Sequence, residues 1–181
     1  MYTRELQRAA KILRAGGIVA YATEYCFGLG CDPANRAAVI HLLRVKQRPV
    51  KKGLIVLAAD MAQLAPYVQH IPPDVAATWP GPHTWLLPAR SDVPGWITGE
   101  HESIAVRVTA HAQAAALCRA AGMAIVSTSA NRSTEAPART DREVVRRFGK
   151  RLDFILPGRV GTALAPTPIR DAVTRQLVRP G

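Results

Sequence analysis

The stretch Ile18-Val19-Ala20-Tyr21-Ala22-Thr23-Glu24 decides the fold class of this chain. Its first five residues are apolar or aromatic and partly β-branched, which is typical of a short buried strand, and a polar pair follows them. A helix is expected before this strand, because residues 6, 10 and 13 are apolar at helical spacing and Gly16-Gly17 supplies a C-terminal stop. The sequence therefore opens with a helix and a buried strand that ends in polar side chains.

The same alternation continues along the rest of the chain. Apolar runs predict further strands at 54–58, 84–88, 104–108, 124–128, 154–156, 169–173 and 176–179. Periodicity predicts a helix after the turn at Asp32-Pro33, with residues 39, 42 and 43 on one face, and further helices at 60–68, 73–79 and 112–121. Another helix is expected at 141–149 behind a Thr140–Glu143 capping box. We interpret Gly28-Leu29-Gly30 as a tight strand exit and residues 91–99 as a loop. Several strands follow one another without a helix, so an α/β fold with a mixed sheet flanked by helices is expected.

Length and composition narrow the class of protein. The chain has 181 residues, which favours a single domain spanning 1–181, and its apolar runs are too short to cross a bilayer. Lys and Arg number 24 against 13 Asp and Glu, so the net charge of +11 favours a polyanionic partner: nucleotide phosphates, RNA or an anionic membrane surface. The three cysteines (Cys26, Cys31 and Cys118) form no C-x-x-C pair and are expected to be reduced thiols of a cytoplasmic protein.

Several familiar motifs are missing from the sequence. The five histidines show no metal-ligand spacing, so no metal site made by the protein is expected. There is no P-loop and no G-x-G-x-x-G, and the serines at 127 and 129 have no G-x-S-x-G frame. Neither metal-assisted hydrolysis nor acyl-enzyme chemistry is supported.

Four polar clusters interrupt the apolar segments, at 21–24, 46–53, 103–108 and 127–131. The second places four cations within seven residues, which suits a triphosphate, although a solvated basic loop has the same composition. Arg107 lies inside the apolar run I-A-V-R-V, where a charge is costly unless it is paired or faces a site; a small carboxylate and a structural ion pair both remain open. The short polar side chains at 127–131 could hold a nucleoside or an amino acid, or form a capping turn.

The order of these clusters resembles the YrdC-like threonylcarbamoyl-AMP synthase family. The resemblance rests on Y-A-T-E…G-L-G, K-Q-R-P…K-G-L, W-P-G-P-H-T, S-I-A-V-R-V…H, S-T-S-A-N, P-I-R-D and a terminal V-R-P-G, and it runs from about Leu6 to Gly181. It implies a twisted mixed sheet with helices around a basic concave cleft. It also implies a nucleotidyltransferase that makes threonylcarbamoyl-AMP and pyrophosphate from L-threonine, bicarbonate and ATP, with Mg²⁺ arriving on ATP. Partner proteins would then transfer the threonylcarbamoyl group to adenosine in tRNA.

The resemblance also implies roles for individual residues. Threonine contacts fall at Thr23, Arg107 and Ser127. ATP contacts fall at Arg48, Lys52, Ser103, Ser129, Asn131 and Arg179. Lys46 and Arg48 are the expected catalytic residues, since they would stabilise the charge that develops during transfer. Ala22 departs from the family pattern, which usually has proline before the threonine.

Two other functions remain open at this point. One is a basic RNA-binding or ribosome-maturation protein without catalysis, because the predicted helix at 141–151 carries five cations, although a solvated helix face is the more common reason for such a pattern. The other is an ATP-dependent carbamoyl-transfer enzyme that uses another amine.

Overall fold

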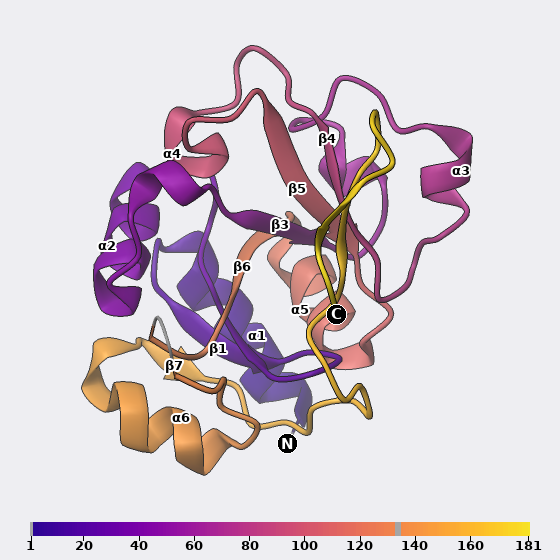
Figure 1. Cartoon of the computed structure of the whole chain (residues 1–181). Helices are drawn as coiled ribbons and strands as arrows, with labels where there is room; N and C mark the ends of the chain where they lie inside the picture. The colour runs from indigo at the N-terminus through magenta and orange to yellow at the C-terminus, as the bar shows by residue number, and fades with distance from the viewer. Residues whose placement is uncertain (1, 133–134) are drawn as a thin grey trace.

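The computed structural model describes residues 2–132 and 135–181, and within them nine strands form one sheet (Figure 1). The strands are β1 (Val19–Ala22), β2 (Phe27–Gly30), β3 (Ile55–Ala58), β4 (Thr84–Pro88), β5 (Ser103–Val108), β6 (Ile125–Ser129), β7 (Phe154–Ile155), β8 (Ile169–Asp171) and β9 (Leu177–Arg179). Their order across the sheet is β7-β1-β2-β6-β3-β5-β4-β8-β9. Three of the neighbouring pairs, β1–β7, β3–β5 and β4–β8, are parallel and the others are antiparallel, so the predicted mixed sheet is confirmed.

Helices cover both faces of this sheet. They are α1 (Tyr2–Arg14), α2 (Arg36–Lys46), η1 (Val50–Lys52), η2 (Ala62–Leu64), α3 (Pro73–Ala76), α4 (Gly95–Thr98), α5 (Ala112–Ala121), α6 (Asp141–Phe148) and η3 (Gly149–Arg151). Helices α1 and α5 pack against each other behind the sheet (Figure 1), where Leu13 and Leu117 are fully buried. On the other face α2, α4 and α6 bury Leu42, Ile97 and Phe148 in a second cluster. None of the helices in the described residues is long and apolar enough to cross a membrane.

The face covered by α1 and α5 is not covered along its whole length. Alternate residues of a strand share a face, so Ile125 and Ser127 of β6 point the same way. Ile125 is fully buried in the cluster with α1 and α5, whereas Ser127 lies one step beyond that cluster and lines a cavity. The helices therefore stop short of one end of the sheet and leave a recess there.

Several predicted elements are confirmed. The strand at 84–88 and the helix at 112–121 have the predicted bounds, and Gly122 ends that helix in the left-handed conformation. The Thr140–Glu143 capping box is formed at the start of α6.

Three local predictions are wrong. Gly28-Leu29-Gly30 is the body of β2 rather than a strand exit, and a Cβ at Gly30 would lie 2.6 Å from the Val126 carbonyl oxygen, so close packing requires the glycine. Residues 60–68 form only the short helix η2, because Pro66 has no N–H to continue a helix. Residues 91–99 contain α4, which begins directly after Pro94.

Candidate functional site

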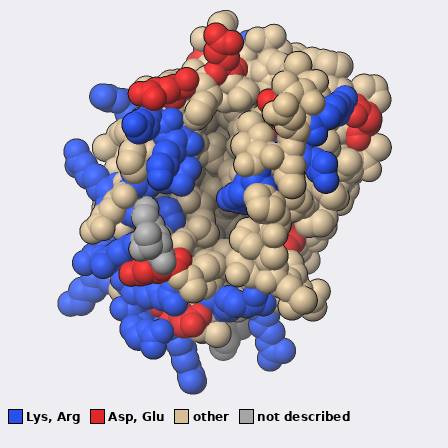
Figure 2. Space-filling view, in the orientation of Figure 1, with Lys and Arg blue, Asp and Glu red and all other residues tan. Residues whose placement is uncertain are grey.

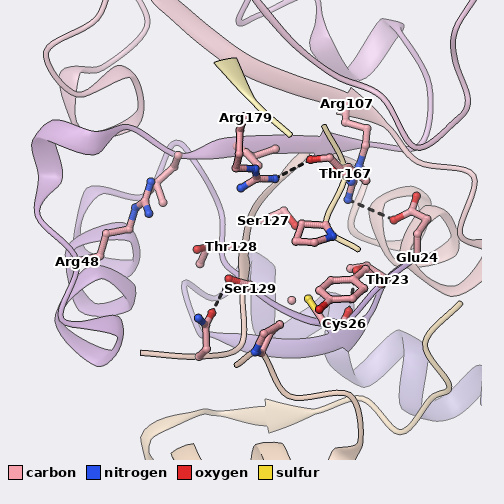
Figure 3. A pocket seen from close by; sticks show the side chains of 17 residues that line it. Thr23, Glu24, Cys26, Arg48, Arg107, Ser127, Thr128, Ser129, Thr167 and Arg179 are labelled. Carbon is pink, nitrogen blue, oxygen red and sulfur yellow. Dashed lines mark hydrogen bonds and ion pairs between the residues drawn. The ribbon is translucent and has the colours of Figure 1, made fainter. Parts of the chain in front are cut away.

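A cavity of about 230 Å³ opens at the uncovered end of the sheet. Figure 2 shows this face hollowed in its middle, with Lys and Arg side chains inside the hollow and along one side of it. The side chains that carry the argument (Figure 3) are Thr23, Glu24, Tyr25, Cys26, Arg48, Arg107, Ser127, Ser129, Asn131, Thr167 and Arg179. They come from strands β5, β6 and β9, the turn after β1, the loop after α2, the segment that follows β6 and the segment before β8. These parts of the chain lie far apart in the sequence.

Arg107 is held in place at one side of this cavity. It is 6% exposed, and its Nη2 lies 3.3 Å from Glu24 Oε2 while its Nη1 donates to Thr167 Oγ1 at 2.7 Å. Glu24 also accepts a hydrogen bond from Thr109 Oγ1 at 2.5 Å. Burial alone would raise the pKa of Glu24, but Arg107 and the Thr109 hydroxyl outweigh it and hold the pKa below its ordinary value. Glu24 is therefore an ionised anchor, and the buried Nε of Arg107 has no partner among the described residues.

Thr167 links Arg107 to a second arginine. While its hydroxyl accepts from Arg107, its carbonyl oxygen accepts from Arg179 Nη2 at 2.8 Å (Figure 3). Burial lowers the pKa of Arg179, and repulsion from Arg107 and Arg48 lowers it further. An arginine remains charged under these conditions, so three mutually repelling cations face one recess. An anion bound between them would relieve that repulsion.

The loop after α2 forms the next wall. Arg48 Nη2 donates to the Gly53 carbonyl oxygen at 2.9 Å, and the buried Arg48 Nε has no partner among the described residues. Arg48 also borders an adjoining cavity of about 210 Å³, together with Lys52, His101, Ser103 and Arg179. Part of the lining of this second cavity is apolar and includes Leu86 and Ile97. The two cavities together reach the lower part of the size range of small-molecule sites, which is roughly 300–1,000 Å³.

Lys46 lies beneath the cavity rather than in its lining. It is 5% exposed, and its Nζ donates to the carbonyl oxygens of Ser129 and of Asn131, the latter at 2.7 Å. The Ser129 hydroxyl in turn donates to Asn131 Oδ1 at 2.5 Å. Burial lowers the pKa of Lys46 to about 8, with a further contribution from the Arg48 charge. Lys46 thus stabilises the end of β6 and the residues after it, where the predicted ATP contacts Ser129 and Asn131 lie.

The turn after β1 contributes the opposite wall. Thr23 Oγ1 donates to the Cys26 carbonyl oxygen at 2.7 Å, and the Thr23 N–H donates to the same atom, so the turn is closed on itself. Arg139 lies over the Tyr25 ring, 4.9 Å from its centroid. Gly161 N–H donates to the Thr23 carbonyl oxygen at 2.9 Å, which fastens the segment between β7 and β8 over this turn.

The predicted site residues are thus distributed over two adjoining cavities. Thr23, Arg107, Ser127, Ser129, Asn131, Arg48 and Arg179 line the first, and Lys52 and Ser103 line the second with Arg48 and Arg179. Sequence reasoning gave no site role to Glu24, although it directly follows Thr23. It also missed Thr167, whose only sequence signal is its position just before P-I-R-D.

Such a mixed sheet carries three guanidinium groups and several hydroxyl groups around one recess, a lining whose charge suits an anionic small molecule. The chain belongs to the Sua5, YciO and YrdC family, since the family model described as "Telomere recombination" matches residues 11–181. The resemblance stated from the motifs is thereby confirmed.

Named relatives agree with this assignment. The chain is 51% identical over 175 residues to the threonylcarbamoyl-AMP synthase of Nitrosococcus oceani, covering 94% of this chain and 95% of that one. It is 51% identical over 184 residues to the threonylcarbamoyl-AMP synthase of Methylobacillus flagellatus, covering 99% and 100%. The crystal structure of P. abyssi Sua5 complexed with L-threonine superposes with a TM-score of 0.90 at 31% identity, over 97% of this chain. This chain spans only 54% of that Sua5 chain.

Proposed function

We propose that this protein is an L-threonylcarbamoyladenylate synthase, which makes threonylcarbamoyl-AMP and pyrophosphate from L-threonine, bicarbonate and ATP. The observation that carries the proposal is the juxtaposition of a buried, oriented arginine with a cluster of cations. Arg107 lies beside the hydroxyl-bearing Thr23 and Ser127, and Arg48 and Arg179 line the same cavity. This arrangement suits an amino acid next to a nucleotide, which are the two substrates that the names of the relatives imply.

Arg107 is suited to the threonine carboxylate. Two of its guanidinium nitrogens are oriented by Glu24 and Thr167, so the group loses little freedom when a ligand binds. The guanidinium group borders the cavity, where a carboxylate oxygen would accept a charge-assisted hydrogen bond from it. The hydroxyl groups of Thr23 and Ser127 then lie within the same recess for the rest of the amino acid.

Arg48, Lys52 and Arg179 are suited to the phosphates of ATP. The threonine amine and bicarbonate combine to a carbamate with loss of water. A carbamate oxygen then attacks the α-phosphorus, and the bond to the pyrophosphate leaving group breaks. Negative charge accumulates in this step, so fixed cations can supply most of the stabilisation. Lys46 would act through Ser129 and Asn131, whose carbonyl oxygens it holds.

A magnesium ion would be held by the triphosphate rather than by the protein. Glu24 is the one carboxylate among the described residues that line the two cavities, and it is engaged by Arg107 and Thr109. No group of three or more His, Cys, Asp or Glu side chains in the described part of the chain could hold a metal ion. When bound with ATP, the ion would neutralise part of the charge on the phosphate oxygens.

The product is a mixed anhydride, which water hydrolyses. We expect it to pass, in the cytoplasm, to proteins that transfer the threonylcarbamoyl group to tRNA.

The test is to incubate the purified chain with ATP, bicarbonate and single amino acids and to measure pyrophosphate. We expect release that requires L-threonine and bicarbonate together. Equal release when either is omitted would overturn the proposal, and equal release with another amine would favour a different carbamoyl-transfer enzyme.

A second candidate function, RNA contact, is supported by the surface of α6 and η3. Arg142, Arg146, Lys150 and Arg151 are exposed there, whereas Arg147 is engaged by the Ala136 carbonyl oxygen and by Glu143. Exposed cations of this kind bind nucleic acid backbones in a salt-dependent way. A double charge reversal, Arg142→Glu with Arg146→Glu, should weaken tRNA binding and leave pyrophosphate release unchanged. Loss of pyrophosphate release in that folded variant would contradict a separate RNA surface.

A further inference from the structure

The hydroxyl group of Tyr21 is an unexplained polar atom next to the site. Tyr21 is fully buried in β1, and its hydroxyl has no hydrogen-bond partner among the described residues. Leaving a hydroxyl buried and unpaired is unfavourable, so such a group calls for a reason beyond packing. Burial raises the pKa of Tyr21 far above its ordinary value, so the group stays protonated and is available as a donor.

The Tyr21 side chain runs across the neighbouring strand because two glycines leave room for it. A Cβ at Gly28 would lie 3.3 Å from Tyr21 Cζ and 3.4 Å from the hydroxyl oxygen. A Cβ at Gly30 would lie 2.8 Å from Tyr21 Cε1. The G-L-G sequence therefore makes space for the ring, and the hydroxyl reaches the surface of β2 that lines the cavity at Gly28.

Ser127 stands on the next strand beyond these glycines. The pairing of Gly28 with Ser129 and of Leu29 with Thr128 continues so that Gly30 lies opposite Ser127. Ser127 therefore shares a sheet face with Tyr21, and its side chain points into the cavity (Figure 3). Burial raises the pKa of Tyr21 and Ser127 partly offsets this, so the Ser127 side chain lies near the Tyr21 hydroxyl, although no hydrogen bond joins the two groups in the free protein.

We infer that Tyr21 is a positioning residue whose O–H donates to Ser127 Oγ when the amino-acid substrate is bound. A serine hydroxyl that accepts from Tyr21 must direct its own proton elsewhere, and the direction left to it is into the cavity. Ser127 is then a donor of fixed orientation toward an oxygen atom of the amino acid. The inference rests on the proposed function, because it assigns the recess beside Arg107 to that substrate.

The test is Tyr21→Phe, which keeps the ring over the glycines and removes only the hydroxyl. We expect the Kd for L-threonine, measured by calorimetry, to rise by up to about tenfold, as loss of one buried hydrogen bond does. The KM for ATP should not change. The melting temperature without ligand should not fall, since the hydroxyl is unpaired in the free protein. Tyr67→Phe is the matched control, because Tyr67 packs against the other core cluster and is absent from the lining of both cavities.

A double-mutant cycle separates positioning from packing. If Tyr21 acts through Ser127, the Tyr21→Phe change should have no further effect on threonine affinity in a Ser127→Ala background. Equal threonine affinity in Tyr21→Phe and in the unaltered chain, or full additivity with Ser127→Ala, would overturn the inference alone. An unaltered chain that neither binds threonine nor releases pyrophosphate with it would instead overturn the proposed function, and this inference with it.

Discussion

Replacement of Arg107 by lysine tests the central contact of the proposed site. Arg107→Ala would leave Glu24 buried without its partner, which typically costs about 3–5 kcal/mol of stability and would obscure any effect on binding. Arg107→Lys keeps a positive charge next to Glu24. It removes the planar fork, and with it the hydrogen bond to Thr167 and the guanidinium group that borders the cavity.

The expected loss follows from that geometry. A hydrogen bond to a charged group contributes about 1.5–3 kcal/mol, which corresponds to a roughly 10- to 150-fold weaker Kd for L-threonine. Affinity for ATP should change much less, because Arg48 and Arg179 remain. Calorimetric titration with threonine and with an ATP analogue measures both, and thermal melting checks that the variant is folded.

Arg90→Lys is a suitable control, because Arg90 forms an exposed ion pair with Asp92 outside both cavities. It should bind threonine like the unaltered chain. Unchanged threonine affinity in folded Arg107→Lys would refute the assignment, and Arg107 would then serve only the ion pair with Glu24.

Three further predictions concern other parts of the chain. Arg48→Ala should lower turnover by about 100-fold or more while shifting the salt dependence of RNA binding by at most about one unit; full turnover would contradict its role at the phosphates. Turnover should decline as the pH rises through about 8, where Lys46 loses its proton, and Lys46→Arg should extend activity to higher pH; a profile with no alkaline decline would argue against this. Thr140→Ala should lower the free energy of unfolding by about 1 kcal/mol in urea titrations without changing turnover, and unchanged stability would show that the cap of α6 contributes little.

Much of the fold follows from local pattern. The strand at 84–88 and the helix at 112–121 are predicted with the bounds that the structure has. A short apolar run predicts the strand, and apolar residues at helical spacing predict the helix, so neither prediction needs information from other parts of the chain. The Gly28-Leu29-Gly30 strand was missed because its glycines signal a turn when they are read alone. Their actual reason is the Tyr21 ring and the Val126 carbonyl of neighbouring strands, which only strand pairing brings close.

The candidate site divides in the same way. The sequence by itself determined which side chains are candidates for the chemistry, since a lone arginine in an apolar strand and a cation-rich loop stand out from their surroundings. Only the tertiary structure decided how they act. Glu24 and Thr167 orient Arg107 from segments about 80 and 60 residues away, and Lys46 lies beneath the site instead of facing it. These contacts depend on distances between segments that are remote in the chain, and such distances cannot be read from residue type and spacing.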